Sequence, residues 1–104
     1  MKNFVKNDYF YANHLTFQGH LVSKVNTFTT KKDKEFITFS LVQRLPNKSL
    51  NYQNFIAFDS KIIDRIKSLF EEGKEVLINA TLGSYKDSSN KAKQSLQVKE
   101  ITIV

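Results

Sequence analysis

The sequence of 104 residues contains no cysteine, and it has one proline and three glycines. Without cysteine the chain can form neither a disulfide nor a thiolate metal site, which fits a reducing compartment, and we expect a cytoplasmic protein. No apolar run approaches the roughly 18 residues that a membrane-spanning helix needs. Residues 1–14 also lack the uninterrupted apolar stretch of a secretory signal.

The residues that usually perform catalysis or hold a cofactor are sparse as well. Gly19, Gly73 and Gly83 lie far apart, so the chain has no glycine-rich phosphate loop. His14 and His20 would share one strand face, but six residues separate them and no nearby carboxylate completes a metal site. No serine or threonine stands in a nucleophile-elbow pattern. We therefore expect no enzyme, no cofactor and no metal site.

Hydrophobic residues make up 40% of the chain, which is enough for one domain with a modest core. The net charge is +6, from 16 Lys and Arg against 10 Asp and Glu. Residues 24–48 hold six basic and two acidic residues, and residues 83–99 hold four basic and one acidic, whereas residues 59–75 are nearly neutral. A polyanionic partner explains this placement. The alternative is that the lysines only keep the protein soluble.

The pattern of apolar residues predicts strands and one short helix. Alternation at period two predicts strands over 13–25, 36–45, 52–58 and 76–85, and a last strand over 96–104 with a bulge near Lys99. Apolar residues at helical spacing predict a helix that Asp59 or Ser60 caps and that ends before Gly73. Residues 29–35 read as a charged turn, and residues 86–94 read as a mobile basic loop.

A helix between the third and fourth strands of a small all-β chain is the layout of an OB-fold barrel. We therefore predict an all-β protein, a five-stranded OB-fold barrel with one α-helix between the third and fourth strands, over residues 13–104. Residues 1–12 form an N-terminal extension that is too aromatic for a free tail. An extra strand, a cover over one barrel end and a subunit interface all fit this segment.

Three segments carry a resemblance to a known family. They are NHLTFQGHL at 13–21, TFSL at 38–41, and the strand, helix and strand of residues 52–82. In order and spacing the chain resembles the bacterial-type single-stranded DNA-binding proteins, which are OB-fold proteins that often form dimers or tetramers. The resemblance implies single-stranded DNA as the partner, a homo-oligomer (dimer or tetramer), and replication or recombination proteins as further candidate partners.

The resemblance also implies where bases would stack. In that family an aromatic residue opens the third strand and stacks on a base, and Tyr52 matches it; Phe58 matches a second aromatic on the same face, and Tyr85 falls close to a third after the fourth strand. The chain departs from the family in having no tryptophan, and no linker or acidic tip follows Val104. That departure puts recruitment of replication enzymes in doubt and suggests a plasmid, phage or mobile-element relative or a specialised paralogue.

The residue types suit this chemistry, because single strands expose base faces and a flexible phosphate chain, which flat aromatics and cations bind. Phe58 fits either the core or the outer face, whereas the hydroxyl of Tyr52 favours a wet edge. We assign Phe17, Phe39 and Phe55 to the core. The candidate nucleic-acid-binding residues are Tyr52, Asn54, Phe58 and Tyr85, with the loop cations Lys31, Lys32, Lys34, Arg44, Lys48, Lys86, Lys91 and Lys93.

The function predicted is sequence-tolerant binding of single-stranded DNA in replication, recombination or mobile-element transfer. Two alternatives stay open. The barrel could instead be a protein-interaction adaptor in a replication or conjugation assembly, in which case residues 4–11 or the barrel face would bind protein. It could also be an RNA-binding barrel of the same type, since only contacts to the 2′-hydroxyl separate RNA from DNA.

Overall fold

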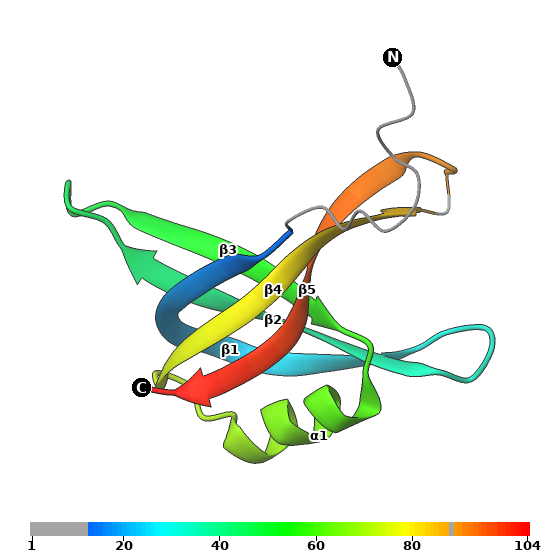
Figure 1. The fold of residues 1–104 in the computed structure, drawn as a ribbon, viewed down its shortest axis with the longest axis horizontal. Helices are drawn as coiled ribbons and strands as arrows, with labels where there is room; N and C mark the ends of the chain where they lie inside the picture. Colours follow the sequence, from blue (N-terminus) through cyan, green and yellow to red (C-terminus); the bar gives the residue numbers. More distant parts are fainter. Residues whose placement is uncertain (1–12, 88) are drawn as a thin grey trace, which may run out of the picture.

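The structure, a computed structural model, describes residues 13–87 and 89–104, which form five strands and one helix (Figure 1). The predictions for residues 1–12 lie outside the described residues. In the described part of the chain the one helix is too short to cross a membrane. In chain order the elements are β1 (Leu15–Thr29), β2 (Glu35–Arg44), β3 (Leu50–Ala57), α1 (Ser60–Leu69), β4 (Glu75–Lys86) and β5 (Ala92–Ile103).

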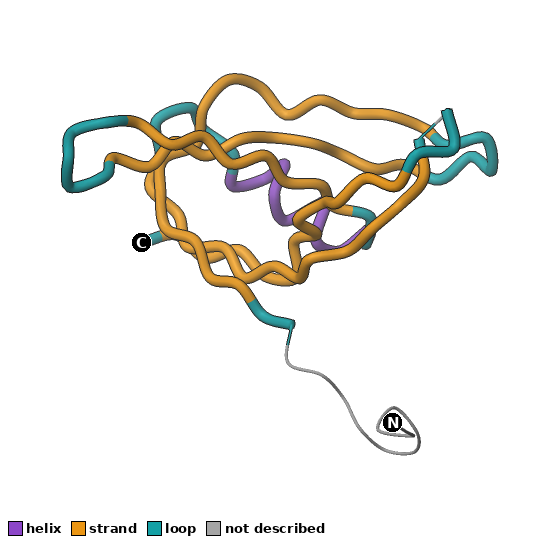
Figure 2. Tube along the Cα trace, turned by 90° about the horizontal axis from the view of Figure 1, so that it is seen from above, coloured by secondary structure: helices purple, strands orange, loops and turns teal. Residues whose placement is uncertain are grey.

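The strands close into a barrel in the order β1-β2-β3-β5-β4. The long strand β1 makes this possible, because one half of it pairs with β4 and the other with β2. All neighbouring strands are antiparallel except β3 and β5, which run parallel. Figures 1 and 2 together show the strands encircling the core, with α1 lying across one end of the barrel. The predicted all-β barrel of five strands with one helix is confirmed, and α1 follows β3 and precedes β4.

The core consists of the strand residues that alternation assigned to the inner face. Phe39 and Phe55 are 3% and 2% exposed, and their rings stack with centroids 5.6 Å apart. Phe17 is partly buried and meets the ring of Phe55 edge-on at 5.3 Å. The core assignment therefore holds for Phe39 and Phe55, while Phe17 lies at the margin of the core. The buried hydrophobic residues are Leu21, Ile37, Phe39, Leu41, Phe55, Ala57, Ile63, Ile66, Val76, Ile78, Ala80, Val98 and Ile101.

Helix α1 begins at a side-chain cap and closes the barrel with one apolar face. The carboxylate of Asp59 accepts hydrogen bonds from the amides of Lys61 (2.8 Å) and Ile62 (3.3 Å), which satisfies free donors of the first turn. Of the two predicted caps, Asp59 is therefore the one used. The helix buries Ile63 and Ile66 against the barrel. After the helix, Gly73 adopts a φ of +87°, a conformation that residues with a side chain rarely adopt, and the chain turns into β4.

The predicted bulge in the last strand is confirmed. Asn79 pairs with Glu100 and Ala80 pairs with Val98, so Lys99 is the additional residue on β5. A second irregularity, which the sequence did not predict, interrupts the pairing of β1 with β2 between Val22 and Asn26.

The predicted loop over residues 86–94 is wrong in its extent. The strands β4 and β5 continue as a hairpin that projects from the barrel, with Tyr85 opposite Lys93 and Lys86 opposite Ala92 (Figure 1). The Asp87 carboxylate accepts hydrogen bonds from the amides of Ser89 (2.8 Å) and Lys91 (3.0 Å), and this closes the hairpin. The error has a physical cause: both faces of a projecting hairpin meet water, so its strands need no apolar alternation. The other strand boundaries agree within about two residues, except that β1 continues to Thr29.

Gly19 lies where β1 and β2 approach each other closely. A Cβ atom at Gly19 would lie 2.7 Å from the carbonyl oxygen of Val42 on β2, which is backbone and cannot move independently. A Cβ atom at Gly83 would also meet a neighbour, but that neighbour is the amide end of the flexible Gln97 side chain.

We predict that Gly19→Ala lowers the free energy of unfolding by about 1–3 kcal/mol, because the added methyl forces β1 and β2 apart. Gly83→Ala is the matched control and costs less, because the Gln97 side chain rotates away. Urea unfolding of the two variants and the parent measures the difference. Equal losses in the two variants would contradict this account of Gly19.

Candidate nucleic-acid interface

The outer face of β2 and β3 carries the residues that the sequence placed there. In the antiparallel register Thr38 lies opposite Ile56, Ser40 opposite Asn54, and Val42 opposite Tyr52. On β2 and β3 the alternate positions include the core residues Ile37, Phe39, Leu41, Phe55 and Ala57. Since side chains of a strand alternate between its faces, the paired residues point outward. We call the surface made by Phe36, Thr38, Ser40, Val42, Tyr52, Asn54, Ile56 and Phe58 the β2–β3 face.

Tyr52 and Phe58 are both accessible on the β2–β3 face. Their side chains are 57% and 50% exposed, so the core reading of Phe58 is wrong. The reason is its position: β3 ends at Ala57, and Phe58 lies where the chain leaves the barrel wall for α1. Six residues of a strand separate Tyr52 from Phe58, a span of roughly 20 Å. The two rings can therefore contact different nucleotides.

Tyr85 reaches the β2–β3 face from the projecting β4–β5 hairpin. It is 50% exposed, and it lines a pocket of about 490 Å³ together with Ile56, Phe58 and three other residues, Phe28, Phe36 and Thr38. A smaller hollow adjoins this pocket and shares Thr38, Ile56 and Tyr85 with it; its other lining residues are Asn54, Phe55, Gln94, Ser95 and Leu96. The structure thus brings Asn54, Phe58 and Tyr85 together around two adjoining hollows, with Tyr52 farther along the same face.

Asn54 has a fixed orientation on this face. The hydroxyl of Ser40 donates a 2.6 Å hydrogen bond to Asn54 Oδ1. Because the carbonyl oxygen is used within the protein, the amide NH2 group is the part of Asn54 that a ligand would meet. That group donates to base or phosphate oxygens.

Phe28 and Phe36 belong to the same surface and were missed as site residues. They lie opposite each other on β1 and β2, and their rings stack with centroids 5.2 Å apart. The ring of Phe36 also lies 5.6 Å from that of Phe58. The signal in the sequence was their placement on either side of the charged turn, which aligns them once the hairpin is folded about that turn.

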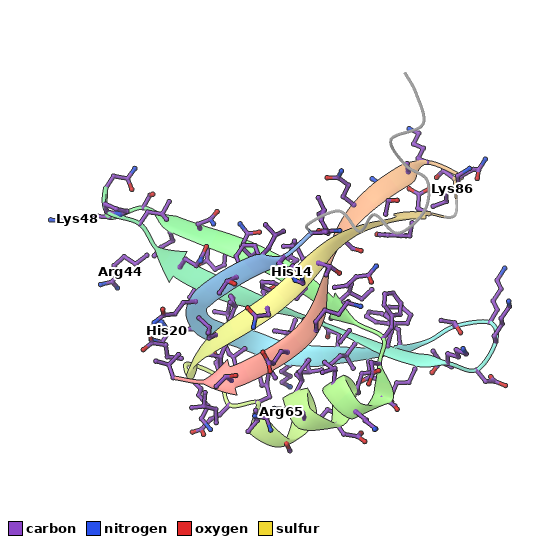
Figure 3. The ribbon with its side chains drawn as sticks, viewed as in Figure 1. His14, His20, Arg44, Lys48, Arg65 and Lys86 are labelled. Carbon is purple, nitrogen blue, oxygen red and sulfur yellow. The ribbon has the colours of Figure 1, made fainter. Side chains whose placement is uncertain are left out.

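The candidate cations lie at both ends of the β2–β3 face rather than in one cluster. Figure 3 shows Arg44 and Lys48 at one end of the long axis and Lys86 at the other. Figures 1 and 2 show the β1–β2 turn at the same end as the β4–β5 turn. All eight candidate cations are exposed: Lys31, Lys32, Lys34, Arg44, Lys48, Lys86, Lys91 and Lys93.

The ion pairs of the described residues leave these cations available. The pairs join His20 to Glu75, Lys67 to Glu35, and Lys74 to Glu71, so none of them uses a candidate cation. His20 corrects one sequence prediction, because β4 brings a carboxylate beside it: Nε2 lies 3.9 Å from Glu75 Oε1. Across residues 13–87 and 89–104 no three histidine or acidic side chains gather as a metal site would require.

Solved structures with the same fold include proteins that bind single-stranded DNA. Rim1, a mitochondrial single-stranded DNA-binding protein of S. cerevisiae, is 19% identical, with a TM-score of 0.72 over 88% of this chain and 94% of Rim1. The Plasmodium falciparum SSB, solved in complex with single-stranded DNA, is 15% identical, with a TM-score of 0.70 over 94% of this chain and 99% of the SSB chain. This chain has their fold.

A third similar structure is a domain of PriB. The N-terminal domain of PriB from Thermoanaerobacter tencongensis, described as dimeric, is 19% identical, with a TM-score of 0.68 over 88% of this chain and 96% of that domain. No protein-family model matches the sequence, and no curated protein is similar to it in sequence. These similarities confirm the resemblance at the level of the fold.

We predict that Tyr52→Ala and Tyr85→Ala each change the free energy of unfolding by less than about 0.5 kcal/mol, because both side chains are half or more exposed. Phe55→Ala, in the core, loses about 3–5 kcal/mol. Thermal or urea unfolding measures all three. A large loss in either tyrosine variant would mean that the ring supports the fold rather than standing free for a ligand.

Proposed function

We propose that the protein binds single-stranded DNA along the β2–β3 face without reading its sequence. The observation that carries the proposal is the exposure of Tyr52, Phe58 and Tyr85 on one surface whose two ends carry cationic turns. Unstacked bases offer flat faces to such rings, and the phosphate chain offers charge to such turns. Sequence tolerance follows because every base has a face that can stack.

The magnitudes favour stacking as the main source of affinity. Each base that stacks on an aromatic side chain is worth about 1–3 kcal/mol by alanine substitution. The cations contribute through release of counterions, which makes affinity fall with salt by a log–log slope of about −0.7 per phosphate contact. The base faces of duplex DNA are already stacked on one another. A duplex would therefore keep the phosphate contacts with the cations but lose the stacking on the aromatic side chains.

The fold supports the same proposal. Two of the similar structures are described as single-stranded DNA-binding proteins, one of them in complex with DNA. We extend to this chain the role of holding single strands during replication, recombination or mobile-element transfer. Assembly as a homo-oligomer and contact with replication or recombination proteins belong to the same proposal.

We predict tight binding to labelled oligo(dT), weak binding to a duplex of equal length, and a steep loss of affinity with salt. Replacing Lys31, Lys32 and Lys34 together by alanine should make the slope shallower by up to about 2, because up to three phosphate contacts disappear. Lys99→Ala, on the β5 bulge, is the control and leaves the slope nearly unchanged. Fluorescence anisotropy across a salt series makes the measurement. Equal affinity for oligo(dT) and duplex at every salt concentration would end the proposal.

We predict that Tyr52→Ala weakens oligo(dT) binding about 5- to 150-fold, the loss of one stacked base, whereas Tyr52→Phe keeps most of the affinity. If the barrel were a protein adaptor instead, both variants would bind nucleic acid like the parent protein. Matched DNA and RNA oligomers in competition test the RNA alternative, because tighter binding of RNA would require contacts to the 2′-hydroxyl.

A further inference from the structure

Phe28, which pairs with Phe36 next to the turn of the β1–β2 hairpin, is not explained by packing of the core. Phe28 is 47% exposed and lies outside the buried core cluster. Its ring stacks on Phe36, which in turn lies against Phe58, so three rings form a continuous row. A contiguous apolar surface on a soluble protein usually marks a binding site, because leaving it in water is unfavourable.

The pocket that these three rings line suits a flat group, such as a base, whose hydrogen-bonding edges the protein does not recognise. Among its lining residues, Thr38 and Tyr85 supply the polar side-chain atoms, and the rest are phenylalanines and Ile56. A base entering this pocket would stack on the rings and find few hydrogen-bond partners. The adjoining hollow differs, since amide and hydroxyl side chains from Asn54, Gln94 and Ser95 line it.

The charge around the pocket favours an anionic ligand over a neutral one. The β1–β2 turn next to Phe28 carries Lys31, Lys32 and Lys34, and it is held in shape by Thr30, whose hydroxyl accepts hydrogen bonds from the amides of Lys32 and Lys34. Glu35 at the foot of the turn is paired with Lys67 of α1, with Nζ 3.2 Å from Oε2. This pairing offsets one of the acidic charges near the turn.

We propose that Phe28 and Phe36 form an additional base-stacking subsite. A single strand lying on the β2–β3 face would then continue past Phe58 and Tyr85 onto the β1–β2 hairpin, where the lysines of the turn hold its phosphates. This inference rests on the proposed function and extends it beyond the three aromatic positions that the sequence singled out. Because the subsite is built from two strands of one hairpin, its two rings stay stacked without a ligand.

The test compares three substitutions at Phe28, which is exposed enough to be replaced without loss of the fold. Phe28→Ala should weaken binding of a long oligo(dT) about 5- to 150-fold, the value of one stacked base. Phe28→Leu keeps an apolar side chain but no flat ring, so it should weaken binding nearly as much. Phe28→Trp keeps the ring and should bind like the parent. Urea unfolding verifies that each variant is folded.

A photochemical measurement gives an independent answer. Digestion with trypsin yields separate peptides for the three aromatic residues: Phe28 lies in 25–31, Phe36 in 35–44 and Tyr52 in 49–61. An oligo(dT) that carries 5-iodouracil should cross-link to peptide 25–31, or to Phe36 within peptide 35–44, as well as to 49–61 when irradiated in the complex. Cross-links that include neither peptide 25–31 nor Phe36 would overturn the subsite.

The outcomes separate this inference from the proposed function. If the Phe28 variants bind like the parent while Tyr52→Ala weakens binding, the subsite is wrong and the proposed function stands. If Phe28→Leu binds like the parent and Phe28→Ala does not, the side chain makes a general apolar contact, and the stacking assignment fails. If neither Phe28→Ala nor Tyr52→Ala changes affinity for oligo(dT), both proposals fail, and the row of rings would instead be a surface for a protein partner.

Discussion

The register of β2 against β3 is the constraint on which the candidate interface depends. Phe39 lies opposite Phe55 inside the barrel, and this pair sets Ser40 opposite Asn54 and Val42 opposite Tyr52 on the outside. Because the side chains of a strand alternate, a slip of β3 by one residue would turn Tyr52 inward and Phe55 outward. The same strand register therefore determines both which residues pack in the interior and which residues lie on the outer surface.

The projecting hairpins explain how a small barrel presents a long surface. The principal extents of the molecule are 47 × 38 × 28 Å, although the closed barrel occupies only the middle of the long axis. The β2–β3 turn extends one end, and the β1–β2 and β4–β5 hairpins extend the other (Figure 1). Lysines and arginine gather in these turns because a hairpin tip buries nothing and tolerates charge. A polyanion can thus meet cations at both ends and rings between them.

Much of the fold was predictable because its determinants are local. The alternation of Tyr52 to Phe58, the cap at Asp59, the stop before Gly73 and the slip of period at Lys99 each depend on a few neighbouring residues. The features that were missed depend on which strands meet. Phe28 and Phe36 become one surface only when the hairpin register is known, and the carboxylate beside His20 comes from a strand far away in sequence. Phe58 is not among the missed features, because alternation placed it on the face of Tyr52 and it is exposed there.

The parallel pairing of β3 with β5 registers Phe55 with Leu96 and Ile56 with Gln97, and within the described chain it is the shortest pairing in the barrel. The barrel wall therefore has the fewest paired residues between β3 and β5. Phe58, which follows β3, and Tyr85, on β4, lie on opposite sides of this pairing. A ligand that contacts both rings would link the two sides of the β3–β5 pairing. Since such a ligand binds only the closed barrel, its binding would raise the free energy of unfolding of the protein.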